Sequence, residues 1–237
     1  MKIFIILLCL FLVSCADKDI EIAYSPGIYI GDFSFDGGSS TSTTALVSKS
    51  FELRFILSGG HVLVNNISEL SSSSVTLEFY QGSDTFIFKE HSISTIFSDN
   101  PDFIGDISGT WATDNGEQEG SISFSKTDKN EVSQSLVADS YNWISQFGSS
   151  GGNTTRVNIT TNSSGNISGS DDLGCVYSGS FDPINGVEGV YPIALVVSSC
   201  GDQNGEYKGL TAIDPYQDSL IIMVSDESKS ATLYMNR

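Results

Sequence analysis

Alternation of apolar and polar residues with a period of two recurs along most of this 237-residue chain and constrains its fold more than any other feature. Phe51, Leu53, Phe55 and Leu57 share one face of such a segment, and the same period recurs at residues 75–79, 86–88, 122–124, 141–147 and 157–159. Successive side chains of a β-strand point to opposite faces, so the pattern is typical of strands that bury one face. Only residues 131–138 fit a helical turn or two.

Two later runs, residues 193–197 and 220–224, are apolar at every position. Such runs are typical of strands that are covered on both faces. We therefore expect further structure to cover the sheet at both segments.

Short turn signals separate the expected strands, and they include Ser58-Gly59-Gly60, Asp114-Asn115-Gly116, Asn185-Gly186 and Asn204-Gly205. Asn-Gly favours a tight hairpin because both residues accept a positive φ. Short strands joined in this way indicate an antiparallel sandwich or an up-and-down barrel. The sequence therefore predicts an all-β fold of two small antiparallel β-barrels, or barrel-like sandwiches, in tandem, with one continuous β-sandwich as the alternative.

A polar stretch that is poor in strand-forming residues, 126–134, predicts a linker between an N-terminal β domain (27–125) and a C-terminal β domain (135–237). A repeated Tyr-x-Gly pattern occurs on both sides of this linker, at Tyr29/Gly31, Tyr80/Gly82, Tyr177/Gly179 and Tyr207/Gly209. Glycine lets a strand coil sharply at a barrel corner, and a tyrosine two residues away covers the gap on the same face. The pattern therefore supports barrels.

The first residues of the chain combine one positive charge, at Lys2, with an apolar run over residues 3–13. This run is shorter than the roughly 20 apolar residues of a transmembrane helix. Leu12-Val13-Ser14-Cys15 resembles the lipobox of bacterial lipoproteins. The resemblance implies a signal peptide at residues 1–14, fatty acyl chains such as palmitate on Cys15, and a lipidated tether at residues 15–26.

Ala16 follows the lipobox cysteine, where lipoproteins that are retained in the inner membrane carry aspartate. The resemblance therefore implies a protein of the bacterial cell envelope that the lipid anchors to the outer membrane. Either the periplasmic face or the cell surface is compatible with this sequence.

Cys9 lies in the expected signal peptide and Cys15 is the expected lipidation site, which leaves Cys175 and Cys200 as a pair. Disulfides form in the oxidising compartments outside the cytoplasm. No C-x-x-C motif is present, and both histidines lie far away in sequence. We therefore expect a structural disulfide between Cys175 and Cys200.

A formal net charge of −18 limits the possible partners. An acidic surface repels phosphates, so we expect no nucleic-acid partner and no basic surface on anionic lipid. The expected contact with the membrane is the lipid anchor on Cys15.

Motifs that carry catalysis are missing from the sequence: it holds no G-x-S-x-G, H-E-x-x-H or phosphate-binding loop, and its only histidines are His61 and His91. The carboxylate pairs Asp171-Asp172 and Glu117/Glu119 are ordinary in so acidic a chain. Residues 99–102 and 114–117 offer oxygen ligands but lack EF-hand spacing, and turn chemistry explains them. We therefore predict no enzyme, no catalytic residue, no metal site and no cofactor.

The second half of the chain resembles the C-terminal portion of small lipoproteins from Gram-negative bacteria. The residues that carry the resemblance are Gly174-Cys175-Val176-Tyr177-Ser178-Gly179, Tyr191, Cys200 and Gly205-Glu206-Tyr207-Lys208-Gly209-Leu210. At the level of architecture, a lipidated chain with small barrels is similar to the factor-H-binding and transferrin-binding surface lipoproteins. No ligand-contact motif of those families is present.

Three functions are compatible with these observations. The first is a non-enzymatic envelope protein that presents loops, such as residues 36–44 or 148–155, to a protein or glycan. The second is a lipocalin-like carrier with a small apolar ligand inside a barrel, lined by Phe51, Phe55, Phe79, Phe86 and Phe88. The third is a structural accessory of the envelope.

Overall fold

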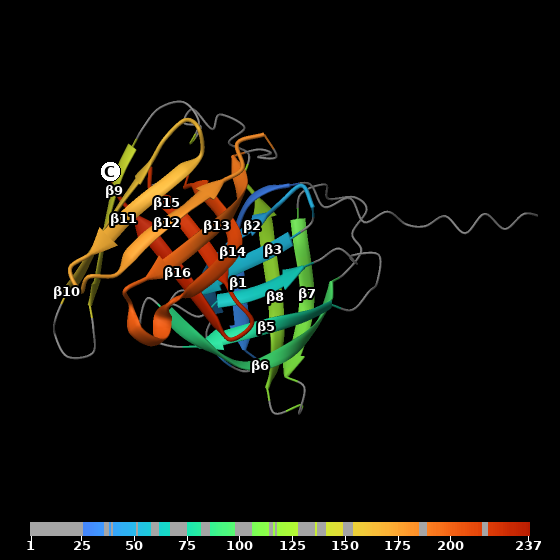
Figure 1. Ribbon diagram of the computed structural model, residues 1–237. Helices are drawn as coiled ribbons and strands as arrows, with labels where there is room; N and C mark the ends of the chain where they lie inside the picture. The colour runs from blue at the N-terminus through green and yellow to red at the C-terminus, as the bar shows by residue number, and fades with distance from the viewer. Residues whose placement is uncertain are drawn as a thin grey trace, which may run out of the picture.

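The computed structural model describes residues 26–35, 38, 40–50, 52–57, 62–66, 75–81, 86–97, 106–113, 116, 118–127, 136, 141–148, 154–184, 189–214 and 218–237. Its strands form two barrel-like units, which Figure 1 shows side by side, with β1–β8 in blue to green and β9–β16 in yellow to red. The predicted all-β class with two barrels is confirmed. Within the described residues, no helix has the length and apolar character needed to cross a bilayer.

The first unit is a ring of consecutive antiparallel pairs that closes where β1 pairs with β8. Each strand lies beside its neighbours in the sequence, as in an up-and-down barrel. Its strands are β1 (Gly27–Phe35), β2 (Ser40–Val47), β3 (Glu52–Leu57), β4 (Val62–Asn66), β5 (Val75–Gln81), β6 (Phe86–Phe97), β7 (Asp106–Thr113) and β8 (Glu119–Lys126).

The second unit repeats this meander. One isolated antiparallel bridge, between Ile144 and Asn236, connects its first strand β9 to the end of its last strand β16. The Ile144 N–H donates to the Asn236 carbonyl at 2.7 Å, and the Asn236 N–H donates back at 2.8 Å. Its strands are β9 (Tyr141–Gly148), β10 (Thr154–Thr161), β11 (Asn166–Asp171), β12 (Val176–Phe181), β13 (Val190–Ser198), β14 (Gly205–Ile213), β15 (Leu220–Ser225) and β16 (Lys229–Met235), with the 3-10 helix η1 (Gly201–Gln203) before β14.

Pairing between β6 and β16 joins the two units into one sixteen-stranded sheet. Lys229, Ser230 and Ala231 lie opposite Phe88, Ile87 and Phe86. The predicted linker and domain limits stay predictions, because the units share a sheet and most of residues 126–134 lie outside the described residues.

Aromatic side chains fill the inside of the first unit where its side chains are described. Phe33 stacks on Trp111 with ring centroids 4.8 Å apart, and Phe55 meets Phe124 edge-on at 5.3 Å. All four are buried, as is Tyr29. Aromatic pairs of this geometry are stabilising beyond the area that they bury.

Large residues from every strand fill the second unit. Trp143 donates its indole N–H to the Thr161 hydroxyl at 2.9 Å, so its one polar atom is satisfied inside the core. The other buried members include Val157, Ile159, Ile167, Tyr177, Phe181, Leu195, Val197, Tyr207, Ile222, Val224 and Leu233. Leu136 belongs to the same core; the other residues of the predicted helical turn, 131–138, lie outside the described residues.

A second apolar cluster lies between the units and consists of outward-facing residues from both. The first unit contributes Ile28, Leu46 and Ile56, and the second unit contributes Val190, Leu210, Ala212, Ile221 and Met223. We call this cluster the docking core. The prediction that residues 220–224 are covered on both faces is therefore correct, since one face lines the barrel and the other lies in the docking core.

The matching prediction for residues 193–197 is wrong, because Ala194 and Val196 are exposed. β13 enters the docking core only at Val190, so over residues 193–197 only its inner face is covered. The expected loop over residues 36–44 is also shorter than predicted, because β2 begins at Ser40.

Glycines of the Tyr-x-Gly pattern lie where strands approach most closely. A Cβ atom added to the glycine would overlap a carbonyl oxygen of the adjacent strand at Gly31, Gly179 and Gly209. The tyrosine two residues earlier is buried in each case. These positions fit the expected role of glycine in coiled barrel strands; Gly82 lies outside the described residues.

Candidate functional site

The predicted disulfide between Cys175 and Cys200 is present, with Cα atoms 4.6 Å apart. It ties the β11–β12 turn to the segment before η1. Asp171 orders the same turn, since its carboxylate accepts the N–H groups of Leu173 and Cys175 and the hydroxyl of Tyr177, each at 2.9 Å. Burial and then this bond to Asp171 raise the pKa of Tyr177 above its ordinary value.

Asp171, Cys175 and Cys200 form a cluster of potential metal ligands. The two sulfur atoms bond to each other, so neither is a free thiolate, which is the form that binds metals. The Asp171 carboxylate already accepts three hydrogen bonds. This cluster is therefore structural.

Among the described residues, the others singled out from the sequence do not assemble into a site. Cys15, His61, Glu117, residues 99–102 and all of residues 114–117 except Gly116 lie outside the described residues. His91 is part of β6, of which only the backbone is described, and Glu119 is exposed on β8. Asp172 is exposed, and its carboxylate accepts the backbone N–H of Arg156 at 3.2 Å, so it stabilises the β11–β12 turn against β10.

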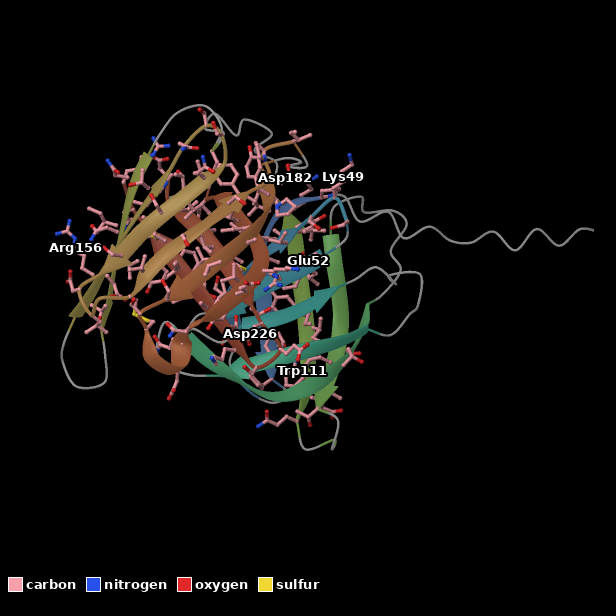
Figure 2. The ribbon with its side chains drawn as sticks, viewed as in Figure 1. Lys49, Glu52, Trp111, Arg156, Asp182 and Asp226 are labelled. Carbon is pink, nitrogen blue, oxygen red and sulfur yellow. A yellow bond between two sulfur atoms is a disulfide. The ribbon has the colours of Figure 1, made fainter. Side chains whose placement is uncertain are left out.

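An open groove of about 520 Å³ lies where the two units meet. Figure 2 shows Glu52 of the first unit and Asp182 of the second at this junction, with Arg156 on the distant side of the second unit. The lining residues are Glu52, Ser164, Ser180, Phe181, Asp182, Pro183, Pro192, Ile193, Ala194, Lys208 and Gly209. We call this the junction groove.

Glu52 of β3 lines the groove from the first unit, and Arg54 of the same strand reaches the second unit. The Arg54 guanidinium is paired with the Glu52 carboxylate and donates to the Ser225 hydroxyl on β15 at 2.9 Å. The Arg54 side chain is only 6 % exposed. A Cβ atom at Gly209 would lie 2.9 Å from Arg54 Cζ, so glycine leaves room for the guanidinium.

The opposite wall is held by turns that contain proline and glycine. The Asp182 N–H donates to the Pro192 carbonyl at 2.8 Å, and the Asp182 carboxylate accepts the Ile184 N–H at 2.9 Å. The Phe181 N–H donates to the Gly165 carbonyl at 2.8 Å, and the Phe181 ring meets Tyr191 edge-on. The wall is thus fixed by backbone bonds and by a buried aromatic anchor.

Tyr234 connects the units beside the docking core. Burial raises the pKa of Tyr234 from 10.0 to about 12; the Asp214 carboxylate adds to the shift, and a hydrogen bond with Thr44 of β2 opposes it. The hydroxyl therefore remains protonated over the physiological range.

Chemically, the junction groove offers charges, hydroxyls and aliphatic surfaces. Its described lining contains two serines but no histidine and no cysteine, so the described wall supplies no imidazole base for either serine. The arrangement suits binding. Sequence reasoning missed the groove because Glu52, Asp182 and Lys208 come from distant parts of the chain.

Comparisons of the chain with known protein families, with curated proteins and with solved structures find no significant match.

Proposed function

We propose that this chain is a non-enzymatic, lipid-anchored protein of the bacterial cell envelope that binds a protein or glycan partner. The acylated residue is Cys15, and the fused barrels act as a rigid support for the binding surface. The junction groove carries the proposal, since it is open while the described inner faces of both barrels are filled by their own side chains.

Of the five phenylalanines expected to line a hollow barrel, only Phe55 has a described side chain, and the inner faces that are described favour this function over the lipocalin-like carrier. A carrier needs a hollow barrel lined by apolar side chains. Phe55, one of the residues expected to line such a cavity, instead packs against Phe33 and Phe124. A structural accessory of the envelope would use the same rigid body without using the groove.

The anchor is tested by fractionation of cells that carry Cys15→Ser. We expect the variant in soluble fractions and the unchanged chain in the outer membrane, because loss of the acyl chains removes the hydrophobic attachment. Membrane retention of the variant would refute the lipid anchor.

Binding is tested by a photo-crosslinking amino acid placed in living cells. At Ala194, an exposed groove residue, we expect a specific adduct; at Ser168, an exposed residue on β11 that does not line the groove, we expect none. Equal labelling from both positions, or none from either, contradicts a groove partner. A lipid retained in the native mass spectrum would support the carrier instead.

A further inference from the structure

We infer that the junction groove binds a neutral, hydroxyl-rich ligand, namely a short saccharide segment. This inference rests on the proposed function and specifies its ligand. The volume of about 520 Å³ falls in the range of roughly 300–1,000 Å³ that is typical of small-molecule sites.

The charges around the groove favour a neutral ligand. Glu52 is compensated by Arg54, and Asp182 and Lys208 add one charge of each sign. An anion would meet the carboxylates of Glu52 and Asp182, and a cation would meet the ammonium of Lys208. A ligand hydroxyl can accept from Lys208 and donate to a carboxylate, so it is compatible with both kinds of group.

The surfaces between the polar groups favour a ring with an aliphatic face. Pro183 and Pro192 are half-buried and Ala194 is exposed, so C–H groups line the space between the charged and hydroxyl side chains. Ser164 and Ser180 are exposed and supply two hydroxyls that both donate and accept. A sugar ring presents C–H groups on its faces and hydroxyls at its edge, which matches this alternation.

The strand pairing disfavours an extended peptide. Peptides that add to a sheet need an unpaired strand edge. The four strands that contribute to the groove are each paired on both sides: β3 with β2 and β4, and β12, β13 and β14 with their sequence neighbours. A saccharide needs no such edge, since side chains alone can bind its hydroxyls.

The walls are already fixed without a ligand. Arg54 holds Glu52, and the Pro192 carbonyl holds the backbone at Asp182. Fixed groups lower the entropy cost of binding. A rigid, mixed surface of this kind can bind a small polar ligand without rearrangement.

The experiment is calorimetric titration of the full lipidated chain in detergent with maltotriose, cellotriose and chitotriose. Trigalacturonic acid and trilysine serve as charged probes. We expect at least one neutral trisaccharide to bind, and both charged probes to bind at least tenfold more weakly. No binding by the three neutral probes, or tighter binding of a charged probe, would overturn the inference.

Two variants locate the site. Ser180→Trp fills the groove from an exposed position and should weaken trisaccharide binding at least tenfold, whereas Ser168→Trp on the same outer face should leave it unchanged. Lys208→Met should weaken binding at least fivefold, and it keeps the test valid if the tryptophan perturbs the fold. Equal affinity in the Ser180→Trp, Lys208→Met and unchanged chains would place the ligand elsewhere and overturn the inference.

The crosslinking result separates the two proposals. A protein adduct at Ala194 without trisaccharide binding overturns the saccharide and leaves the binding function standing. Equal or absent adducts at Ala194 and Ser168, together with no trisaccharide binding, contradict the groove as a binding site altogether.

Discussion

Arg54 shows how one side chain connects the two barrels. It begins on β3 of the first unit, pairs with Glu52 and bonds Ser225 of the second unit, almost entirely out of water. Removal of one partner from a buried ion pair is costly because it leaves the other charge poorly compensated. The pair therefore matters more for stability than an exposed one would.

We predict that Arg54→Met lowers the free energy of unfolding by about 2–3 kcal/mol, as measured by urea denaturation. The double variant Glu52→Gln/Arg54→Met should recover part of this loss, because it also removes the carboxylate. A change below about 0.5 kcal/mol in the single variant would show that the pair contributes little.

Tyr234 predicts how the stability responds to alkali. Its pKa is about 12 in the folded chain and about 10 when unfolded. Below pH 10 both states are protonated and this tyrosine adds no pH dependence. Between pH 10 and 12 the unfolded state loses the proton first, so folding stability falls as pH rises, and the fall ends above pH 12.

Denaturation of the unchanged chain and Tyr234→Phe at pH 8 to 11.5 tests this effect. We expect the urea midpoint of the unchanged chain to fall more steeply above pH 10 than that of the variant. Parallel curves would show that Tyr234 titrates alike in both states.

At the scale of the element, β14 has two packing faces. Tyr207 and Ile213 lie in the barrel core, while Leu210 and Ala212 lie in the docking core. Glycine at position 209 lets β14 pack closely on both faces. A side chain there would overlap the Met223 carbonyl and approach Arg54. A strand that is crowded on both faces tolerates little added volume.

We predict that Gly209→Ala destabilises the chain by about 2–3 kcal/mol, measured by chemical denaturation. Gly38→Ala is the matched control: no atom of the described residues lies closer than 3.4 Å to an added Cβ, so we expect a change within about 0.5 kcal/mol. Equal effects at both positions would contradict the steric explanation.

The strands and their inner faces could be predicted from the sequence, because burial on one face imposes a period of two. Leu53 and Phe55 are inside the first barrel as that period requires. The use of the outward face could not be predicted in the same way: alternation does not distinguish Glu52 and Arg54 at a junction from polar residues in water. The all-apolar run of residues 220–224 correctly indicated a strand covered on both faces. The same pattern at residues 193–197 misled, because Ala194 and Val196 are exposed.

At the scale of the whole molecule, the docking core and the β6–β16 pairing couple the barrels. Units that share a buried apolar interface unfold together when the interface contributes enough free energy. The junction groove depends on this coupling, because its walls come from both units. Sequence alone could not place the groove, since it requires the docked arrangement.

We predict one calorimetric unfolding transition for the unchanged chain and two for Met223→Asp, which buries a charge in the docking core. Ile56→Asp, from the other side of the interface, should have the same effect. Val196→Asp, at a position 40 % exposed, should keep one transition. Two transitions in the unchanged chain would show that the barrels are independent.

The position of β16 also sets the timing of assembly. A growing chain folds from its N-terminus, and β16 follows every other strand. Until β13 to β16 emerge, Ile28, Leu46 and Ile56 lack the residues that cover them in the finished molecule. The first barrel thus passes through a stage with an uncovered apolar patch, and this interval is when the chain is most exposed to aggregation and to capture by chaperones.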